Sequence, residues 1–288
     1  MEQAKKATCT TCPHACILEE GWLGFCSSRR APAADGHEGA YRVVPEGYGR
    51  ITSLALDPIE KKPLARYMPG TTVLSLGSYG CNMDCPFCQN ASIARASAND
   101  VEWRVMQPAE LVDLALDMRD RRCVGIAYTY NEPLVNWEFL RDTGKFAHEA
   151  GLVNVLVSNG MATARVISKI APLVDAANID LKCFSEEGYR ALGGNFRAVQ
   201  NTIARLVEQP SCHVEVTTLV VPGISDDEEQ IDAMARWLAS LDQHIPYHLT
   251  RFFPRHRMRN AQPTPVRTLY ELADVARRHL DDVMLGNV

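Results

Sequence analysis

From Thr71 onward, short apolar runs alternate with longer amphipathic stretches. Each short run has four to nine residues, is rich in β-branched side chains and is followed by polar or turn-forming residues. That combination predicts buried β-strands. Six runs are expected to form strands: Val73–Leu76, Val124–Tyr128, Val153–Val157, Ala177–Leu181, His213–Val221 and Tyr247–Phe253.

The intervening stretches have a helical period. In Pro108–Asp120, the apolar residues Leu111, Leu114, Ala115 and Met118 fall on one face, and a proline suits the first helical turn. Comparable patterns predict five more helices: Leu134–Ala150, Thr163–Leu173, Phe196–Glu208, Glu228–Leu241 and Val266–Leu280.

Strand and helix therefore alternate in sequence, which is the pattern of an α/β protein whose parallel strands are joined by right-handed crossovers. Six such units predict a partial (βα)6 TIM-like barrel. A complete eight-unit barrel would need two further repeats that the pattern does not contain. In either geometry the active site lies at the carboxyl ends of the strands.

The first part of the chain, Met1 to about Gly70, has no helical period and is rich in Cys, Gly and Pro. The small and polar residues of Ala31–Gly39 predict a loop within it. We therefore expect two parts: a Cys-rich N-terminal segment and strap over residues 1–70, and a core barrel over residues 71–288.

Composition is that of a soluble enzyme. The 288 residues are 46% hydrophobic, enough to bury a large core. No apolar stretch approaches the ~20 residues of a membrane span, and polar Met1–Thr11 lacks a signal-peptide core, so we expect a cytoplasmic protein without membrane contact. Ten cysteines then favour metal binding over disulfides. A net charge of −5 gives no reason to expect nucleic acid.

One basic run departs from this balance. Arg251–Arg259 contains four arginines and a histidine. A solvated loop is favoured over a patch that steers an anionic substrate or partner.

The most informative motif follows the first predicted strand. Cys81, Cys85 and Cys88 have C-x-x-x-C-x-x-C spacing, with Phe87 just before the third cysteine. Thiolates are ligands that suit iron–sulfur clusters, and three of them on one loop leave one iron of a four-iron cluster free to bind a substrate. Zinc ligation or simple burial is the disfavoured alternative.

In this loop the sequence resembles the radical S-adenosylmethionine (SAM) superfamily. The resemblance implies a [4Fe-4S] cluster whose free iron chelates SAM, and reductive cleavage of SAM to methionine and a 5′-deoxyadenosyl radical. It also implies a flavodoxin- or ferredoxin-type electron donor.

Polar residues follow other predicted strands. Asn131 and Glu132 can accept hydrogen bonds from a ligand ammonium, although Asn-Glu-Pro is also an ordinary helix-entry turn. Asp180 and Lys182 flank Leu181 and so point to the same side of their strand. They are candidates for a ligand site or, alternatively, for an ion pair that closes the barrel mouth.

The family resemblance adds roles to these positions. It places Asn131 and Glu132 at the SAM amino group and a Val-Pro-Gly turn at Val221–Gly223 on the adenine side. The other implied SAM contacts are Ser158 and Asn159 at the ribose or carboxylate, Asp180 and Lys182 at the methionine end, and His248 at the ribose. Without the resemblance, His248 is as readily a core histidine.

A second cysteine group lies near the N-terminus. Cys9, Cys12, Cys16 and Cys26 fall within eighteen residues of a core-poor segment. Four thiolates suit a structural zinc site that supplies folding energy, and an auxiliary iron–sulfur cluster would use the same ligands. A third alternative is that they bind neither. His14 could replace one thiolate.

Between Cys9 and Asn90 the resemblance is closer than superfamily level. The motifs Cys-x-x-Cys-Pro-His-x-Cys, Tyr48-Gly49-Arg50 and Asp57-Pro-Ile-Glu-Lys-Lys-Pro-Leu64 are similar to the radical SAM component of the AmmeMemoRadiSam system, itself similar to pyruvate formate-lyase activating enzymes. This implies Memo-type and AMMECR-type partner proteins. Ala91 departs from the pattern, because many relatives have an aromatic residue there.

The leading hypothesis is a radical SAM enzyme that removes a hydrogen atom from an unidentified substrate. A glycyl-radical activating enzyme is the first alternative, disfavoured because no second cysteine-rich insert follows the radical loop. A non-catalytic metal-binding or electron-transfer module is the second, disfavoured by the polar residues that follow the other strands.

Overall fold

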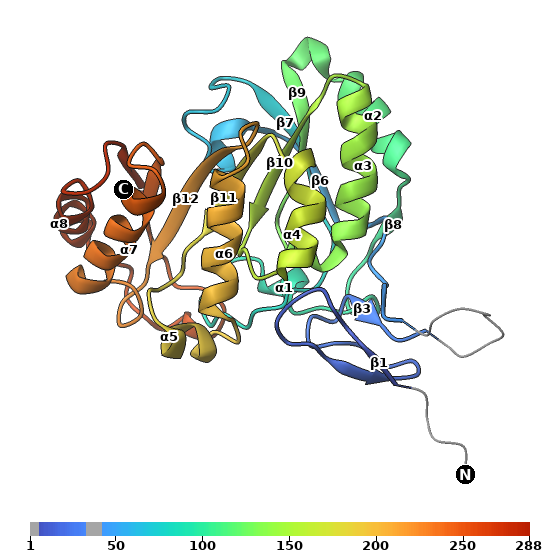
Figure 1. The fold of residues 1–288 in the computed structure, drawn as a ribbon, viewed down its shortest axis with the longest axis horizontal. Coiled ribbons are helices and arrows are strands. Elements are labelled where there is room, and N and C mark those ends of the chain that lie inside the picture. The colour runs from blue at the N-terminus through green and yellow to red at the C-terminus, as the bar shows by residue number, and fades with distance from the viewer. Residues whose placement is uncertain (1–5, 33–41) are drawn as a thin grey trace.

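The computed structural model describes residues 6–32 and 42–288. Of the predicted loop Ala31–Gly39, residues 33–39 lie outside the described residues. Figure 1 shows an open, curved sheet with helices packed along one side and small hairpins at one end.

The sheet has eight strands in the order β14-β13-β12-β11-β10-β9-β7-β6. All neighbours from β7 to β14 pair parallel, whereas β6 pairs antiparallel with β7. The strand bounds are β6 Ser53–Pro58, β7 Thr72–Gly77, β9 Cys123–Tyr128, β10 Val153–Ser158, β11 Ala176–Asp180, β12 His213–Val220, β13 Tyr247–Arg251 and β14 Val283–Gly286.

All six predicted strands are confirmed, but the parallel part of the sheet is larger than predicted. It contains a seventh parallel strand, β14, which Val283–Gly286 forms beside β13. The sequence pattern missed it because the strand has only four residues and directly follows two aspartates. The two edge strands, β6 and β14, do not pair with each other, so the barrel is partial, as predicted.

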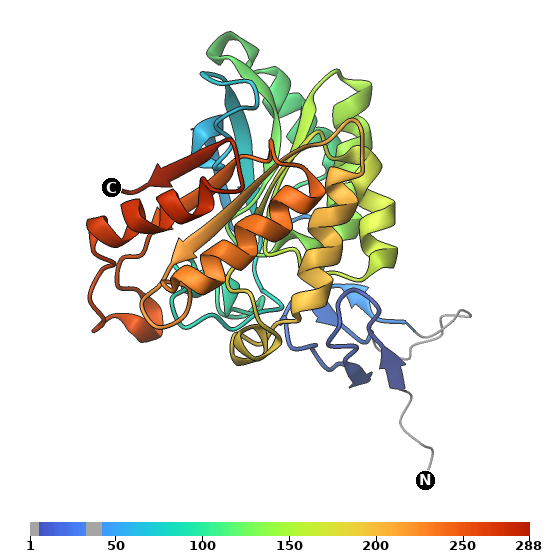
Figure 2. The same ribbon diagram turned by 60° about the vertical axis from the view of Figure 1, so that its left-hand side comes forward.

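The long helices lie on one side of the sheet (Figures 1 and 2). Their apolar faces pack on it because buried positions recur with the helical period. All six predicted helices are confirmed, one with the predicted bounds and five shorter than predicted. Their bounds are α2 Pro108–Leu116, α3 Trp137–Glu149, α4 Ala164–Ile170, α6 Phe196–Val207, α7 Glu228–Leu241 and α8 Val266–Ala276.

Several shorter helical turns complete the crossovers. Two short helices were not predicted. The four-residue helix α1, Ala91–Ala94, follows the cysteine loop, and the six-residue helix α5, Glu186–Ala191, follows β11. Five single turns of 3-10 helix are η1 Ile59–Lys61, η2 Arg119–Arg121, η3 Pro133–Asn136, η4 Ala171–Leu173 and η5 His256–Met258. Three of them take up ends of the predicted helices.

The segment between β6 and β7, residues 59–71, passes inside the sheet. We call it the strap. Ile59 and Leu64 are fully buried in it, where they pack with Val73, Val155 and Ala176 in a small core of their own. The strap thereby fills the interior near the amino ends of the strands.

The N-terminal residues form three small two-stranded pairs. They are β1 Lys6–Thr8 with β2 Ile17–Glu19, β3 Arg29–Arg30 with β4 Val44–Pro45, and β5 Arg50–Ile51 with β8 Arg104–Val105. The first pair lies near the end of the molecule that carries α1 and α5 (Figure 1). Backbone contacts fix it there, since the amide of Thr163 donates to the carbonyl of Thr11.

Candidate active site

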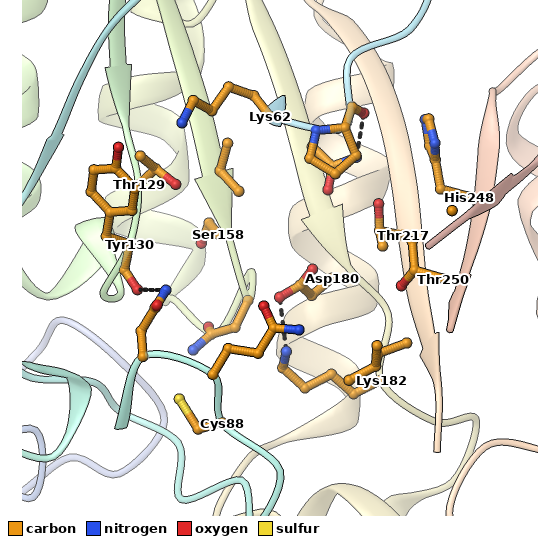
Figure 3. A pocket seen from close by; sticks show the side chains of 18 of the residues that line it. Lys62, Cys88, Thr129, Tyr130, Ser158, Asp180, Lys182, Thr217, His248 and Thr250 are labelled. Atoms are coloured by element: carbon orange, nitrogen blue, oxygen red, sulfur yellow. Dashed lines mark hydrogen bonds and ion pairs between the residues drawn. The ribbon is translucent and has the colours of Figure 1, made fainter. Parts of the chain in front are cut away.

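The interior of the sheet contains a cavity of about 950 Å³. It extends from the strap at Lys62 to the cysteine loop at Cys88, as Figure 3 shows. A cavity at the upper end of the usual range for ligand pockets has room for more than one small molecule. Its walls come from the strap, the cysteine loop, the segment that follows β9, and the strands β10, β11, β12, β13 and β14.

All three cysteines of the loop line this cavity. The loop leaves the end of β7 through Gly80, whose φ of +86° favours glycine, and where a Cβ atom would lie 2.2 Å from the carbonyl oxygen of Cys26. Met83 and Phe87 alternate with the cysteines and are 2% and 4% exposed. Their burial anchors the loop at the cavity wall, to which both residues also contribute.

These thiols lie in an environment that disfavours a free thiolate. Burial raises the pKa of Cys81 well above its ordinary value, that of Cys85 to about 11 and that of Cys88 as well. Ligation to iron replaces the proton with a cation and removes this cost. Among the described residues no fourth cysteine lines the cavity, so the donor set fits a four-iron cluster with one iron open to a ligand.

Asn82 ties the loop to the end of β10. Its side chain is fully buried, donates to the carbonyl of Met161 at 2.6 Å and accepts from the amide of Asn159 at 2.9 Å. The amide nitrogen of Asn159 also lies 3.6 Å from the sulfur of Cys81. Asn159 therefore contacts the cysteine loop directly.

Asn131 and Glu132 line the cavity, but both have partners within the protein. The side chain of Asn131 accepts from the amide of Ser78 and donates to the carbonyls of Tyr79 and Gly80. These bonds brace the strand end that leads into the cysteine loop. The amide group of Asn131 is thus fully hydrogen-bonded within the protein, and its role in this structure is to hold the cavity wall in place.

Glu132 joins β9 to β10. Its carboxylate accepts from the hydroxyl of Ser158 at 2.7 Å and from the backbone amides of Asn159 and Leu134. Burial raises the pKa of Glu132 to about 7, although these three donors favour the charged form. The predicted residues Glu132, Ser158 and Asn159 thus form one connected unit at the cavity wall.

Asp180 and Lys182 form an ion pair of 2.8 Å at the end of β11 (Figure 3). The Lys182 side chain is 15% exposed and that of Asp180 38%. Burial acts against the charge of Lys182, but Asp180 and the nearby thiol of Cys85 outweigh it and raise the pKa of the ammonium. Lys182 therefore carries a positive charge beside the cysteine loop.

His248 lies on β13, next to β12, and lines the cavity. Its Nε2 atom is hydrogen-bonded to Glu215, a fully buried carboxylate that also contacts His213 and accepts from the backbone amides of Ala65 and Arg66. Sequence reasoning missed Glu215, although a Glu between two valines in a predicted strand was a visible signal. The carboxylate fixes the strap to β12.

Further cavity residues were also missed. Lys62 belongs to the Asp57–Leu64 motif, and Asn178, Thr217 and Thr250 are polar residues on the inner faces of strands. The strand period of two could have identified Asn178, because it stands two residues before Asp180 and so shares its face.

The N-terminal cysteines lie outside the cavity. Cys9, Cys12 and Cys26 are buried and Cys16 is partly buried. Burial raises the pKa of Cys12 to about 12 and that of Cys26 to about 11. Within residues 6–32 and 42–288, no three His, Cys, Asp or Glu side chains are arranged around the position of a single metal ion.

His14 has another partner. Its Nε2 atom donates to the carbonyl of Asn82 in the radical loop at 2.9 Å, and its ring packs on Phe25. The N-terminal cysteine group is therefore fastened to the loop that carries Cys81, Cys85 and Cys88.

The basic run Arg251–Arg259 is largely exposed, as expected for a solvated loop, and one part of it contacts the cysteine loop. Arg257 pairs with Asp84 at 2.9 Å, and the backbone amides of Arg257 and Met258 donate to the carbonyl of Pro86. The run thus packs on the outer side of the cysteine loop.

Residues 76–237 match the radical SAM superfamily, so the chain belongs to that superfamily. The site accordingly belongs to an enzyme of the radical SAM type, whose cofactors are a [4Fe-4S] cluster and SAM. This excludes the non-catalytic module considered above. No helix among the described residues has the length and apolar character to cross a membrane.

Sequence relatives indicate which radical SAM enzymes this chain resembles. The chain is 36% identical to an uncharacterised protein of Methanocaldococcus jannaschii, over 98% of this chain and 82% of that protein. It is 23% identical to the pyruvate formate-lyase-activating enzyme of Clostridium pasteurianum, over 59% of this chain and 72% of that enzyme. The chain is thus a homologue of glycyl-radical enzyme activating enzymes.

Solved structures share the fold. A radical SAM methyltransferase from Sphaerobacter thermophilus has a TM-score of 0.58 at 16% identity, covering 76% of this chain and 67% of its own. QueE from Escherichia coli has a TM-score of 0.52 at 12% identity, covering 83% and 94%. These similarities support the predicted partial barrel.

Proposed function

We propose that this enzyme reductively cleaves SAM to methionine and a 5′-deoxyadenosyl radical, and that the radical removes a hydrogen atom from a substrate in the same cavity. Cys81, Cys85 and Cys88 would hold the [4Fe-4S] cluster that supplies the electron. The observation that carries the proposal is the convergence of these three thiols and the polar strand ends on one cavity of about 950 Å³.

The protein's own residues would bind and orient SAM at the cluster end of the cavity. Lys182, positively charged and mostly buried, suits the SAM carboxylate, and Asp180 beside it suits a hydroxyl or ammonium group. We assign the amino group to Asn131 and Glu132 and the remaining polar contacts to Ser158, Asn159 and His248. Since Asn131 and Glu132 are engaged within the protein, their main effect is to position the wall that SAM would meet.

Production of 5′-deoxyadenosine tests this proposal. Anaerobically reconstituted protein, reduced in the presence of SAM, should release 5′-deoxyadenosine and methionine in equal amounts. The Cys81/Cys85/Cys88→Ala variant should release neither, whereas Cys123→Ala, which removes a buried thiol remote from the cavity, should retain cleavage. Cleavage by the triple variant would contradict the assignment.

The subgroup is the radical SAM component of the AmmeMemoRadiSam system. The N-terminal cysteine motif and the strap motif Asp57–Leu64 support this. The partners would then be Memo-type and AMMECR-type proteins, with a flavodoxin- or ferredoxin-type electron donor. Co-purification of tagged protein with these two partners, compared with a variant lacking residues 1–30, tests this assignment.

The chain would consist of the N-terminal segment and strap, residues 1–70, and the core barrel, residues 71–288. The pairing of β6 with β7 and the full burial of Ile59 and Leu64 in the strap couple the two parts tightly. Cys9, Cys12, Cys16 and Cys26 would form a separate metal site, with zinc or an auxiliary cluster as the occupant.

A second candidate function is activation of a glycyl-radical enzyme, because several homologues are activating enzymes of that class. Electron paramagnetic resonance distinguishes the two. Reduced enzyme with SAM and pyruvate formate-lyase should give a stable glycyl radical signal only if the second function holds.

A further inference from the structure

The end of the cavity away from the cysteine loop contains a buried cation with incomplete hydrogen bonding. The side chain of Lys62 is 4% exposed and lines the cavity (Figure 3). An ammonium group has three donors, yet among the described residues its one hydrogen bond goes to Asp57, at 2.8 Å. The ring of Tyr130 lies beneath the same nitrogen at 4.9 Å.

Asp57 is not the partner of Lys62 alone. The hydroxyl of Tyr130 donates to the same carboxylate oxygen at 2.6 Å, and the ammonium of Lys61 lies 3.6 Å from the other oxygen, although water screens this exposed charge. Glu60 also lines the cavity, but its side chain is turned to the backbone amide of Gly70 in an exposed position, where water screens it. The remaining donors of the Lys62 ammonium therefore favour a monoanion.

Polar atoms without a partner lie on the neighbouring strands. Asn178 is fully buried, and its amide nitrogen donates to the carbonyl of Pro63, next to Lys62. The amide oxygen of Asn178 and the hydroxyl of Thr217 have no hydrogen-bond partner among the described residues. Both residues line the cavity. Buried polar atoms of this kind are costly unless a ligand or water satisfies them.

Two of these residues, Lys62 and Asn178, lie away from the SAM end, and Thr217 lies at its edge, as the register partner of Asp180 on β11 and of His248 on β13. Asn178 precedes Asp180 by two residues on β11, so it lies about 6.6 Å nearer the amino end of the sheet. Figure 3 shows the Asp180–Lys182 pair between Lys62 and Cys88. A molecule at Lys62 would therefore be bound in the cavity beyond SAM.

We propose that Lys62, Asn178 and Thr217 form the substrate subsite, and that the substrate is a small organic acid with a hydroxyl or amino group. The carboxylate accepts charge-assisted hydrogen bonds from Lys62, and the hydroxyl or amino group donates to Asn178 or Thr217. This inference rests on the proposed function, because it assigns the second molecule in the cavity. The strap motif then has a binding role besides its structural one.

A ligand series tests the two ends of the subsite separately. The probes are ω-hydroxy acids with two to five carbons, the matching ω-hydroxy amides, and the acids without the hydroxyl group. Binding to cluster-loaded protein saturated with SAM is measured by saturation-transfer NMR and calorimetry. At least one hydroxy acid should bind about ten- to a hundredfold more tightly than its amide, and about two- to tenfold more tightly than the plain acid.

Variants assign each preference to its residues. Lys62→Met should abolish the preference for acid over amide, whereas Lys61→Met, which removes an equal charge from an exposed side chain, should retain most of it. The double change Asn178→Leu and Thr217→Val should abolish only the advantage of the hydroxyl group. The melting temperature of each variant shows that it is folded.

SAM binding separates this inference from the proposed function. Lys62→Met should bind and cleave SAM like the wild type, so a protein that cleaves SAM but shows no preference for any acid over its amide would overturn the subsite alone. Loss of SAM affinity in Lys62→Met would also overturn it, because the lysine would then belong to the SAM site. Equal binding of neutral amides, or of glycyl peptides in place of acids, would contradict the assignment to an organic acid.

Discussion

The side-chain amide of Asn159 lies 3.6 Å from the sulfur of Cys81 and holds Asn82 of the same loop at 2.9 Å. Asn159 follows β10, so this contact fixes the cysteine loop to a strand that is remote from it in sequence. An N–H group directed at a cluster sulfur stabilises the more reduced, more negative state of a cluster. The main role of Asn159 is therefore to hold the cysteine loop, and contact with a ligand is secondary.

We expect Asn159→Leu to lower the reduction potential of the [4Fe-4S] cluster, because the donor to the Cys81 sulfur is lost. Potentiometric titration monitored by electron paramagnetic resonance measures the change. Iron content should remain at four per chain, since all three thiols are retained. Asn154→Leu, at a buried asparagine that holds β10 to α3 instead of the loop, is the control, and an equal potential in wild type and Asn159→Leu would exclude this role.

Asp180 gives a cleaner test of SAM binding than Asn159, because its hydrogen bond within the described residues goes to Lys182 and not to the cysteine loop. Asp180→Asn and Lys182→Met should each weaken SAM binding about ten- to a hundredfold, the effect of one charge-assisted hydrogen bond. Calorimetry with cluster-loaded protein measures the affinity. Iron content and melting temperature are the controls, and unchanged affinity in both variants would assign the ion pair to structure.

Glu132 predicts a pH dependence of stability. Its pKa is raised by burial from 4.5 to about 7, so between these values the folded protein binds more protons than the unfolded chain. The contribution to stability is complete below pH 4.5 and is lost as the pH rises through 7, by about 3 kcal/mol for a shift of this size. In Glu132→Gln this slope should disappear.

Denaturation of the two proteins between pH 5 and 8 measures the difference. In the wild type, the backbone N–H of Asn159 donates to the Glu132 carboxylate. In Glu132→Gln the side-chain NH2 group would face that N–H group, so the absolute stability of the variant should be lower. Only the slope is therefore compared. Parallel pH profiles would indicate that Glu132 stays charged throughout.

The fold was predictable from local patterns because each parallel strand is a β-branched run and each crossover an amphipathic helix. The strand β6 was not, since Ser53–Pro58 alternates weakly and lies in a segment dominated by Cys, Gly and Pro. Its strand character depends on pairing with β7. Register between strands remote in sequence is a tertiary property, and no local period encodes it.

The candidate site likewise contains residues that the local sequence identifies and residues that only the tertiary structure places there. The spacing of Cys81, Cys85 and Cys88 could be recognised because all ligands lie on one loop. Lys62 could not be assigned to the cavity, because a lysine in a polar motif is normally exposed and its burial follows from Ile59 and Leu64 packing inside the sheet. Likewise, the contact of His14 with the cysteine loop joins residues that are 68 positions apart.

Glu215 should hold the strap in place. Its buried carboxylate accepts from the backbone amides of Ala65 and Arg66, and the bonds from His213 and His248 lower its pKa to about 2 despite burial. Glu215→Leu should destabilise the protein by about 2–5 kcal/mol, because two buried amides and two histidines lose their acceptor. Glu208→Leu, on the exposed end of a helix, is the control.

Limited proteolysis gives a local readout for the same pair of variants. Cleavage within residues 59–71 should become faster in Glu215→Leu under native conditions, while the helices of the outer layer stay protected. An intact strap with only a global loss of stability would show that Ile59 and Leu64 hold it without the carboxylate.

The last prediction concerns Cys9, Cys12, Cys16 and Cys26, which we expect to bind metal independently of the radical cluster. Their segment forms only two- and three-residue strands, so metal binding should supply stability that burial cannot. Metal analysis of the Cys81/Cys85/Cys88→Ala variant isolates this site. Zinc at one per chain would identify a structural site, and four irons with their own redox signal an auxiliary cluster.

A further change at Cys12 distinguishes bound metal from adventitious metal. Adding Cys12→Ala to the triple variant should remove the remaining metal and expose residues 6–32 to proteolysis, whereas Cys212→Ala, at a partly buried thiol elsewhere, should change neither. Because His14 fastens this segment to the cysteine loop, Cys12→Ala in an otherwise native chain should also lower occupancy of the radical cluster. A triple variant that holds no metal under anaerobic, metal-replete conditions, with residues 6–32 still protected, would rule out both occupants.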